Sequence, residues 1–125
     1  MGVMLQTFYW DCPREDNKEF QWWNYIRREI PGLAKAGFTC LWLPPIHKAA
    51  NLGGPSMGYD PYDYYDLGEF NQKGSIPTWF GARKDLEALI VEAHENSLSV
   101  IADIVINHNS GADAQEVNPI TGQAR

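Results

Sequence analysis

The segment Val100–His108 holds the side chains best suited to chemistry, because polar groups interrupt an apolar run of strand length. Asp103 stands in the middle of this run, and Asn107 and His108 end it. A carboxylate in a buried strand is costly unless it is hydrogen-bonded, paired or near a metal ion. The strand pleat would place Asp103, Val105 and Asn107 on one side, with His108 over the carboxyl end. In α/β proteins this end carries the ligand and the reaction.

This segment alone also permits a purely structural interpretation. A single Asp in a strand can cap a neighbouring loop, and a terminal Asn-His pair can simply begin a turn. The rest of the chain has to decide between a functional cluster and a capped turn.

Aromatic residues supply a second kind of candidate chemistry, since the chain has five Trp, six Tyr and five Phe. Core packing is the expected role of Phe8, Trp42 and Phe80. The tyrosines between Tyr59 and Tyr65 instead stand among Gly, Pro and Asp in a long loop. A flat apolar face with a polar edge suits a sugar ring as well as it suits a core.

Alternating strands and helices are predicted to position these groups. Leu33 and other apolar residues spaced by three and four predict the first helix, which Pro31 should kink or restart and Gly37 should end. A stretch of about 40 residues before the second helix has little periodicity, and loops of this length are typically functional or disordered. The expected elements are a strand over Val3–Trp10, a helix over Trp22–Ala36, a strand over Phe38–Leu43, a helix from Arg83 to about Asn96 and a strand over Leu98–Ile106.

This order predicts an α/β fold with a parallel sheet and right-handed crossovers. Three strands and two helices do not close on themselves, so the chain is expected to be the front part of a larger fold.

Composition excludes several classes of partner. The formal net charge of −6 argues against nucleic acid and anionic membrane as main partners. No apolar run approaches the roughly 18 residues of a membrane span, and the N-terminus lacks the features of a signal peptide. Cytoplasm is therefore the default location, with a mature secreted form as the alternative.

Cys12 and Cys40 are too few for a disulfide framework, and Cys40 is expected to be a small buried side chain.

Three stretches carry a family resemblance: Gln6–Asp11, Gly58–Gly68 and Asp103–His108. Together they resemble the N-terminal part of the catalytic domain of α-amylases of glycoside hydrolase family 13, close to the archaeal-type enzymes. The resemblance implies about three βα units of a (β/α)8 barrel, truncated before completion. Residues 1–108 would supply the first three strands and two helices, and residues 109–125 would open the domain that this family inserts after strand three.

The resemblance also implies roles for individual residues. Asn107 resembles a ligand of a structural calcium ion, and its amide oxygen is the hard donor that calcium requires. Tyr59 resembles the aromatic platform under the sugar at the cleavage site, and His108 resembles the histidine that hydrogen-bonds this sugar. Asp103 is expected to be a structural carboxylate below the site, and Asp63 matches a further family position there.

Other acidic residues of the long loop are expected to be solvated charges, namely Asp60, Asp66 and Glu69. No catalytic residue is expected in this chain. The retaining mechanism of the family needs two carboxyl groups about 5–5.5 Å apart, and in such amylases these groups come from later strands.

The implied parent protein is a monomeric, endo-acting hydrolase that cleaves α-1,4 bonds of starch- or glycogen-type glucans with retention. The 125-residue polypeptide alone is expected to be inactive, and to be poorly folded or self-associating because its sheet edges are open. Three alternatives stay open. They are a transglycosylase, branching enzyme or isomerase with the same front end, a starch-binding module without chemistry, and a truncated product without a function of its own.

Overall fold

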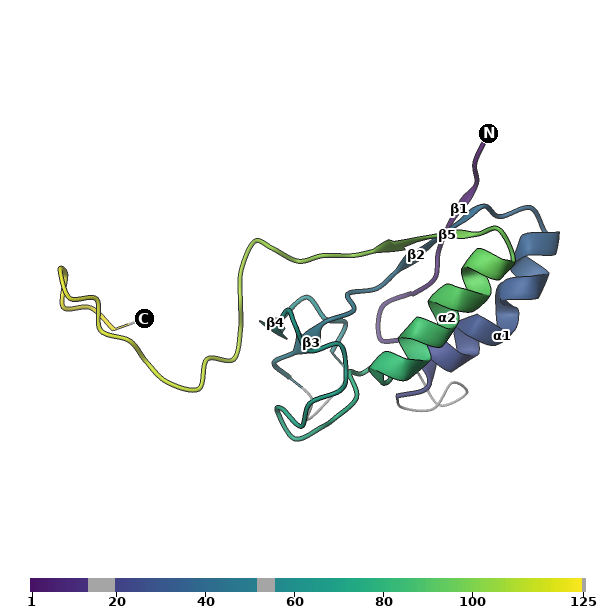
Figure 1. Ribbon diagram of the computed structural model, residues 1–125. Helices are drawn as coiled ribbons and strands as arrows, with labels where there is room; N and C mark the ends of the chain where they lie inside the picture. The colour runs from purple at the N-terminus through teal and green to yellow at the C-terminus, as the bar shows by residue number, and fades with distance from the viewer. Residues whose placement is uncertain (14–19, 52–55, 125) are drawn as a thin grey trace.

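The computed structural model describes residues 1–13, 20–51 and 56–124. Its body has two layers, a parallel sheet and a pair of helices on one of its faces, and the segment after the last strand extends away from this body (Figure 1). The elements are β1 (Met4–Gln6), α1 (Trp22–Lys35), β2 (Cys40–Leu43), β3 (Lys48–Ala49), β4 (Pro61–Asp63), α2 (Arg83–Glu95) and β5 (Ser99–Ala102).

The main sheet has the strand order β1-β2-β5, and both pairings are parallel. Cys40 stands opposite Met4 on one side and opposite Ser99 on the other. The predicted α/β class with a parallel sheet is therefore confirmed. The long loop between β2 and α2 contains a second, two-stranded sheet, in which β3 pairs antiparallel with β4.

Both helices end in the same hydrogen-bonded turn. After α1, the N–H groups of Gly37 and Phe38 donate to the carbonyls of Ala34 and Leu33 over 3.0 and 3.2 Å, and Gly37 has φ +96°. This is the left-handed helix end that glycine favours, as predicted. The helix runs on through Pro31, so the expected restart there is wrong. Pro31 is exposed, which leaves its ring on the solvent side.

The core lies between the helices and one face of the sheet. Leu41 and Leu43 alternate with the outward residues of β2 and are fully buried, because the period-two pleat sends them toward the helices. The helices meet them with their predicted apolar faces. The buried helix residues in this core are Trp22, Trp23, Ile26, Ile30, Leu86, Leu89 and Ala93.

The strands are shorter than predicted, which changes the position of Asp103. β5 ends at Ala102, so Asp103 follows the strand and does not interrupt it. Ala102 is paired with Leu43, and the next residue along β2 is Pro44. A proline has no N–H to donate, so the ladder stops there. The predicted strand to Ile106 is therefore wrong in its second half.

No helix within the described residues covers the opposite face of the sheet (Figure 1). This face carries Trp42 with the edge-to-face ring of Phe8 at 5.6 Å, and both are only partly buried. Of the three aromatic residues expected in the core, only Phe80 is almost fully buried, and it lies in the core between the sheet and the helices. Cys40 shares the uncovered face and is partly exposed, whereas Cys12 is fully buried. Ile101 is 47% exposed on this face. Among the described residues, no helix is long and apolar enough to cross a membrane.

We expect the 125-residue polypeptide to self-associate through this face, because apolar side chains and open strand edges are accessible together. Ile101→Lys should lower the apparent mass in analytical ultracentrifugation, since it places an ammonium group in the centre of the contact. Val91→Lys is the matched control, because Val91 on α2 is 56% exposed but lies away from the sheet. A reducing buffer excludes disulfide exchange at Cys40. Association that persists unchanged in Ile101→Lys would contradict this prediction.

Candidate functional site

The candidate site lies where the carboxyl ends of the strands meet the long loops. Tyr59 comes from the loop before β4, and its hydroxyl donates to Asp103 Oδ2 over 2.8 Å just past the end of β5. Burial raises the pKa of Tyr59 to about 12, and the hydrogen bond to the Asp103 carboxylate adds to this shift. The phenol therefore stays protonated at ordinary pH and remains a donor. The bond fixes the orientation of the Tyr59 ring.

His108 joins the same cluster. Its Nε2 lies 2.8 Å from the backbone oxygen of Tyr59, and its Nδ1 lies 3.3 Å from the side-chain nitrogen of Asn107. A carbonyl can only accept, so Nε2 carries the proton, and Nδ1 can then accept from the Asn107 amide. The Tyr64 hydroxyl donates to the backbone oxygen of His108 over 3.0 Å. The structure thus brings Tyr59, Asp103, Asn107 and His108 together; their roles in binding stay predictions.

An aromatic pair extends the cluster toward β1. Trp10 stacks on Tyr59 with ring centroids 6.3 Å apart and planes inclined by 9°, and Trp10 is 67% exposed. The pair borders an open depression of about 300 Å³. This depression is lined by Trp10, Asn51, Ser56, Met57, Tyr59 and Asp60. An exposed indole beside a polar rim can hold a sugar ring by stacking.

A buried ion pair, which the sequence analysis did not predict, anchors the loop that contains Tyr59–Tyr65. Lys48 on β3 and Asp66 have completely buried side chains, with Lys48 Nζ 3.3 Å from Asp66 Oδ2. Nζ also lies 2.6–3.4 Å from the backbone oxygens of Phe70, Ser75, Ile76 and Pro77. The only sequence signal for this site was a lone lysine that follows an apolar strand.

Asp66 is the clearest correction to the sequence analysis, because it is not a solvated charge. Burial would raise the pKa of its carboxyl group, but the backbone N–H groups of Gly68, Glu69 and Phe70 and the charge of Lys48 outweigh this and hold the pKa below its usual range. Asp60 is also only partly exposed, and its carboxylate accepts from the Asn51 N–H over 2.9 Å and from the Ser56 hydroxyl. Only Glu69 is an exposed charge as expected, paired with Arg83 at 2.6 Å.

Asp63 acts as a turn-forming residue in this structure. Its Oδ1 accepts from the Tyr65 N–H and its Oδ2 from the Gln72 side chain, both over 2.9 Å. The Gln72 amide also reaches Asp66 Oδ2 over 3.1 Å, which connects Asp63 to the buried ion pair. The part of the chain that the structure describes contains no group of three His, Cys, Asp or Glu side chains placed to hold a metal ion.

His47 is a second buried polar residue that the sequence analysis missed. It is 2% exposed, and within the described residues neither ring nitrogen has a hydrogen-bond partner. Its ring meets the Tyr64 ring edge-on at 5.4 Å. Burial lowers the pKa of His47 below its ordinary value, so the folded protein holds this imidazole neutral.

Lys48→Met should cost about 3–5 kcal/mol of folding free energy, because it leaves the Asp66 carboxylate buried without its cation. Urea unfolding of the natural-length protein, followed by circular dichroism, measures the loss. Lys84→Met is the matched control, since Lys84 is exposed on α2, and it should change stability little. Similar losses in the two variants would show that the buried pair contributes nothing special.

His47 should make the fold less stable in mild acid. The unfolded chain protonates this imidazole near pH 6.5, whereas the folded chain resists protonation, so the unfolded state binds more protons as the pH falls. Stability should therefore drop below about pH 6.5, by at most about 1.4 kcal/mol per pH unit for one proton. His47→Phe should flatten this part of the profile in urea titrations between pH 5 and 8. An acid-induced loss of stability that is the same in His47→Phe as in the unchanged protein would contradict this prediction.

Comparison with known proteins agrees with this geometry. The family model described as the α-amylase catalytic domain matches residues 14–119. The cytoplasmic α-amylase of Escherichia coli strain K12 is 44% identical over 114 residues, and the glucan 1,4-α-maltohexaosidase of Bacillus sp. strain 707 is 40% identical over 116 residues. These alignments cover 91% and 93% of this chain but only 22% and 21% of the relatives.

Solved structures give the same answer for the fold. An alternansucrase in complex with isomaltotriose superposes with a TM-score of 0.71 at 26% identity, over 92% of this chain and 11% of that protein. The family match spans well over half of the chain, and it includes Tyr59, Asp103 and His108. The chain belongs to the α-amylase catalytic-domain family of glycoside hydrolases.

Proposed function

We propose that the protein containing this chain is a retaining endo-hydrolase of α-1,4 bonds in starch- and glycogen-type glucans. In this proposal the present residues form one wall of its sugar site. The observation that carries the proposal is the cluster in which the Tyr59 hydroxyl is bonded to Asp103 and the Tyr59 carbonyl to His108. Two loops from different strands are thereby joined at the end of the sheet where this fold places its chemistry.

Each residue of the site would make a different contact with the glucan. The Tyr59 ring, held by Asp103, would lie under the sugar, and the exposed Trp10 would extend the apolar surface along the glucan. His108 is exposed and offers an imidazole N–H to a sugar oxygen once its bond to Tyr59 is exchanged. None of these groups is a nucleophile or an acid for glycoside cleavage. The two carboxyl groups that this mechanism needs would come from residues outside the 125.

Calcium is a proposed structural ion, since members of this family commonly bind it. Asn107 supplies the right kind of donor, an exposed side-chain amide. Calcium takes six to eight oxygen ligands, and the described residues offer no acidic or histidine cluster to complete such a set. Asn107 would thus be one ligand of a larger set. Residues 109–125 would begin the inserted domain, and the whole enzyme would act as a monomer.

Transglycosylation is the second candidate, favoured by the likeness to an alternansucrase. The two reactions differ in the acceptor of the glucosyl group, water or another sugar. Digestion of amylose by the natural-length protein distinguishes them. Hydrolysis releases new reducing ends and short linear products, whereas transfer keeps the number of reducing ends constant.

Tyr59→Ala should lower kcat/KM on amylose about tenfold or more, which corresponds to about 1.4 kcal/mol of lost interaction. Tyr59→Phe keeps the ring but loses the bond to Asp103, so it should lie between Tyr59→Ala and the unchanged protein. Tyr65→Ala is the control, because Tyr65 is 88% exposed in the same loop. The comparison requires the natural-length protein. A Tyr59→Ala variant as active as Tyr65→Ala would contradict the role of the ring.

A further inference from the structure

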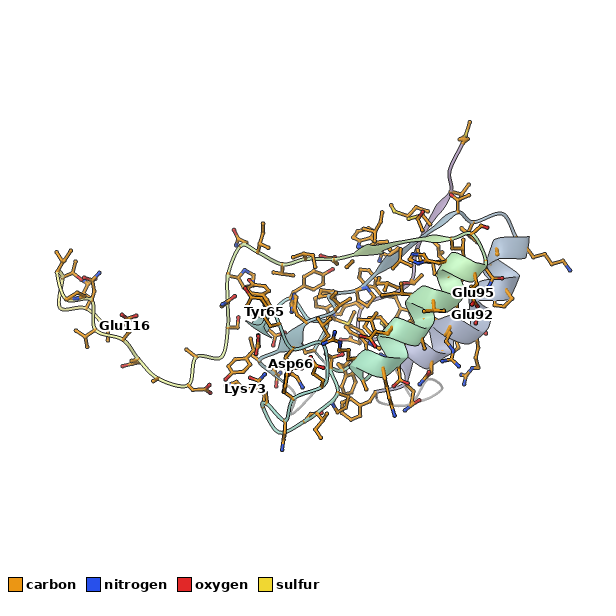
Figure 2. All side chains as sticks on the ribbon, viewed as in Figure 1. Tyr65, Asp66, Lys73, Glu92, Glu95 and Glu116 are labelled. Carbon is orange, nitrogen blue, oxygen red and sulfur yellow. The ribbon has the colours of Figure 1, made fainter. Side chains whose placement is uncertain are left out.

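The segment that follows β5 bends past the loop around β4 and is fastened to it by three side chains (Figure 1). Lys73 Nζ lies 2.6 Å from Asp113 Oδ1, and the Tyr62 hydroxyl donates to Asp113 Oδ2. The same ammonium group lies 4.2 Å from the centre of the Tyr62 ring. We call Tyr62, Lys73 and Asp113 the clasp. Figure 2 shows Lys73 beside the chain that leaves β5.

Backbone contacts continue the same attachment. Lys73 Nζ also donates to the Gly111 carbonyl over 2.6 Å, and the Ser110 N–H donates to the Pro61 carbonyl over 2.7 Å. Gly111 has φ +70°, and a Cβ added there would lie only 2.5 Å from the Cβ of Ala50. The segment after β5 therefore lies directly against the loop, with a close approach that glycine allows.

The Lys73 ammonium group and the Asp113 carboxylate carry opposite charges, so their contact stabilises both charged forms. Hydrogen bonds from Lys73 and Tyr62 lower the pKa of Asp113, and the bond to Asp113 raises the pKa of Tyr62. Asp113 is exposed, and a simple ion pair at such a position would contribute little. Here one ammonium group meets a carboxylate, a carbonyl and an aromatic face, so its loss would remove three contacts at once.

We propose that the clasp positions His108 for sugar binding, so that Tyr62, Lys73 and Asp113 are positioning residues of the site. This rests on the proposed function. Residues 103–110 belong to no strand, so the β-sheet does not fix their course. Asp103 holds this stretch at its start through Tyr59, and the clasp holds it at its end through Gly111 and Asp113. His108 lies between these two anchors, and within this stretch its ring meets the Tyr59 carbonyl and its backbone oxygen accepts from Tyr64.

The clasp itself is tested by hydrogen–deuterium exchange on the natural-length protein. Lys73→Met should increase amide exchange over residues 107–113 at least tenfold, because the Ser110 N–H loses its fixed position against Pro61. Lys73→Arg keeps a cation at this position and should stay close to the unchanged protein. Lys84→Met, at an exposed lysine on α2, is the matched control. Unchanged exchange in Lys73→Met would overturn the proposal whatever the activity of the protein.

The effect on His108 is tested by kinetics on amylose. Lys73→Met should raise KM fivefold to tenfold while kcat per folded molecule changes less than twofold, and Lys73→Arg should restore KM. A merely structural role would lower the folded fraction and leave KM unmoved. In a His108→Ala background, Lys73→Met should have no further effect on KM, because the group that it positions is gone. Additive effects of the two substitutions would overturn the positioning role.

The two tests separate the clasp from the proposed function. A natural-length protein without activity on glucans would overturn the proposed function, yet faster exchange in Lys73→Met would still establish the clasp. An active protein in which Lys73→Met leaves both exchange and KM unchanged would overturn the clasp alone.

Discussion

The buried ion pair of Lys48 and Asp66 is the interaction on which the candidate site depends. Lys48 belongs to β3, whose partner β4 follows directly on Tyr59 and Asp60. Asp66 lies just beyond β4, and its own backbone oxygen accepts from the Lys48 N–H over 2.8 Å. The pair therefore joins both strands of the small sheet at one point. It thereby anchors the loop that holds Tyr59 against Asp103 at a fully buried point.

The pair also solves a problem of backbone hydrogen bonding. Residues 66–77 form no helix or strand of the main sheet, yet several of their carbonyl oxygens face inward, toward Lys48. Buried carbonyls need partners, and ladders or helices normally supply them. One ammonium group does this here, while the Asp66 carboxylate accepts the backbone N–H groups of Gly68, Glu69 and Phe70. The charges neutralise each other, and each also organises a turn of the loop.

Local patterns were enough to predict the helices and the parallel sheet. The apolar period and Gly37 placed the first helix to within a residue, because both act within a few positions of the chain. The bond between Tyr59 and Asp103 joins residues 44 positions apart, and no local pattern contains it. Only the family resemblance brought these residues into one site. The end of β5 depends on Pro44, which directly follows the neighbouring strand β2, and the segment Val100–His108 alone does not reveal it.

Asp66 was predicted wrongly for a related reason. An acidic residue among Gly, Tyr and Glu has the composition of a solvated loop, and burial is decided by a lysine on another strand. Lys48 itself was the better signal, since a lone cation after an apolar strand has to find acceptors or leave the core. The same argument applies to His47, its neighbour, whose two buried nitrogens have no partner among the described residues.

The two ends of the sheet differ in the length of their connections, and this difference explains where the site lies. At the amino ends, helices pass into strands through short turns around Gly37 and Ser97, both with positive φ. At the carboxyl ends, the connections from β1 to α1 and from β2 to α2 are long. They carry Trp10 and Tyr59, and the segment after β5 carries His108. Short turns fix the packing of helices on the sheet, whereas long connections can meet one another above it. The side chains that meet there come from the segments that follow three strands, so the sheet order brings together groups that the sequence keeps far apart.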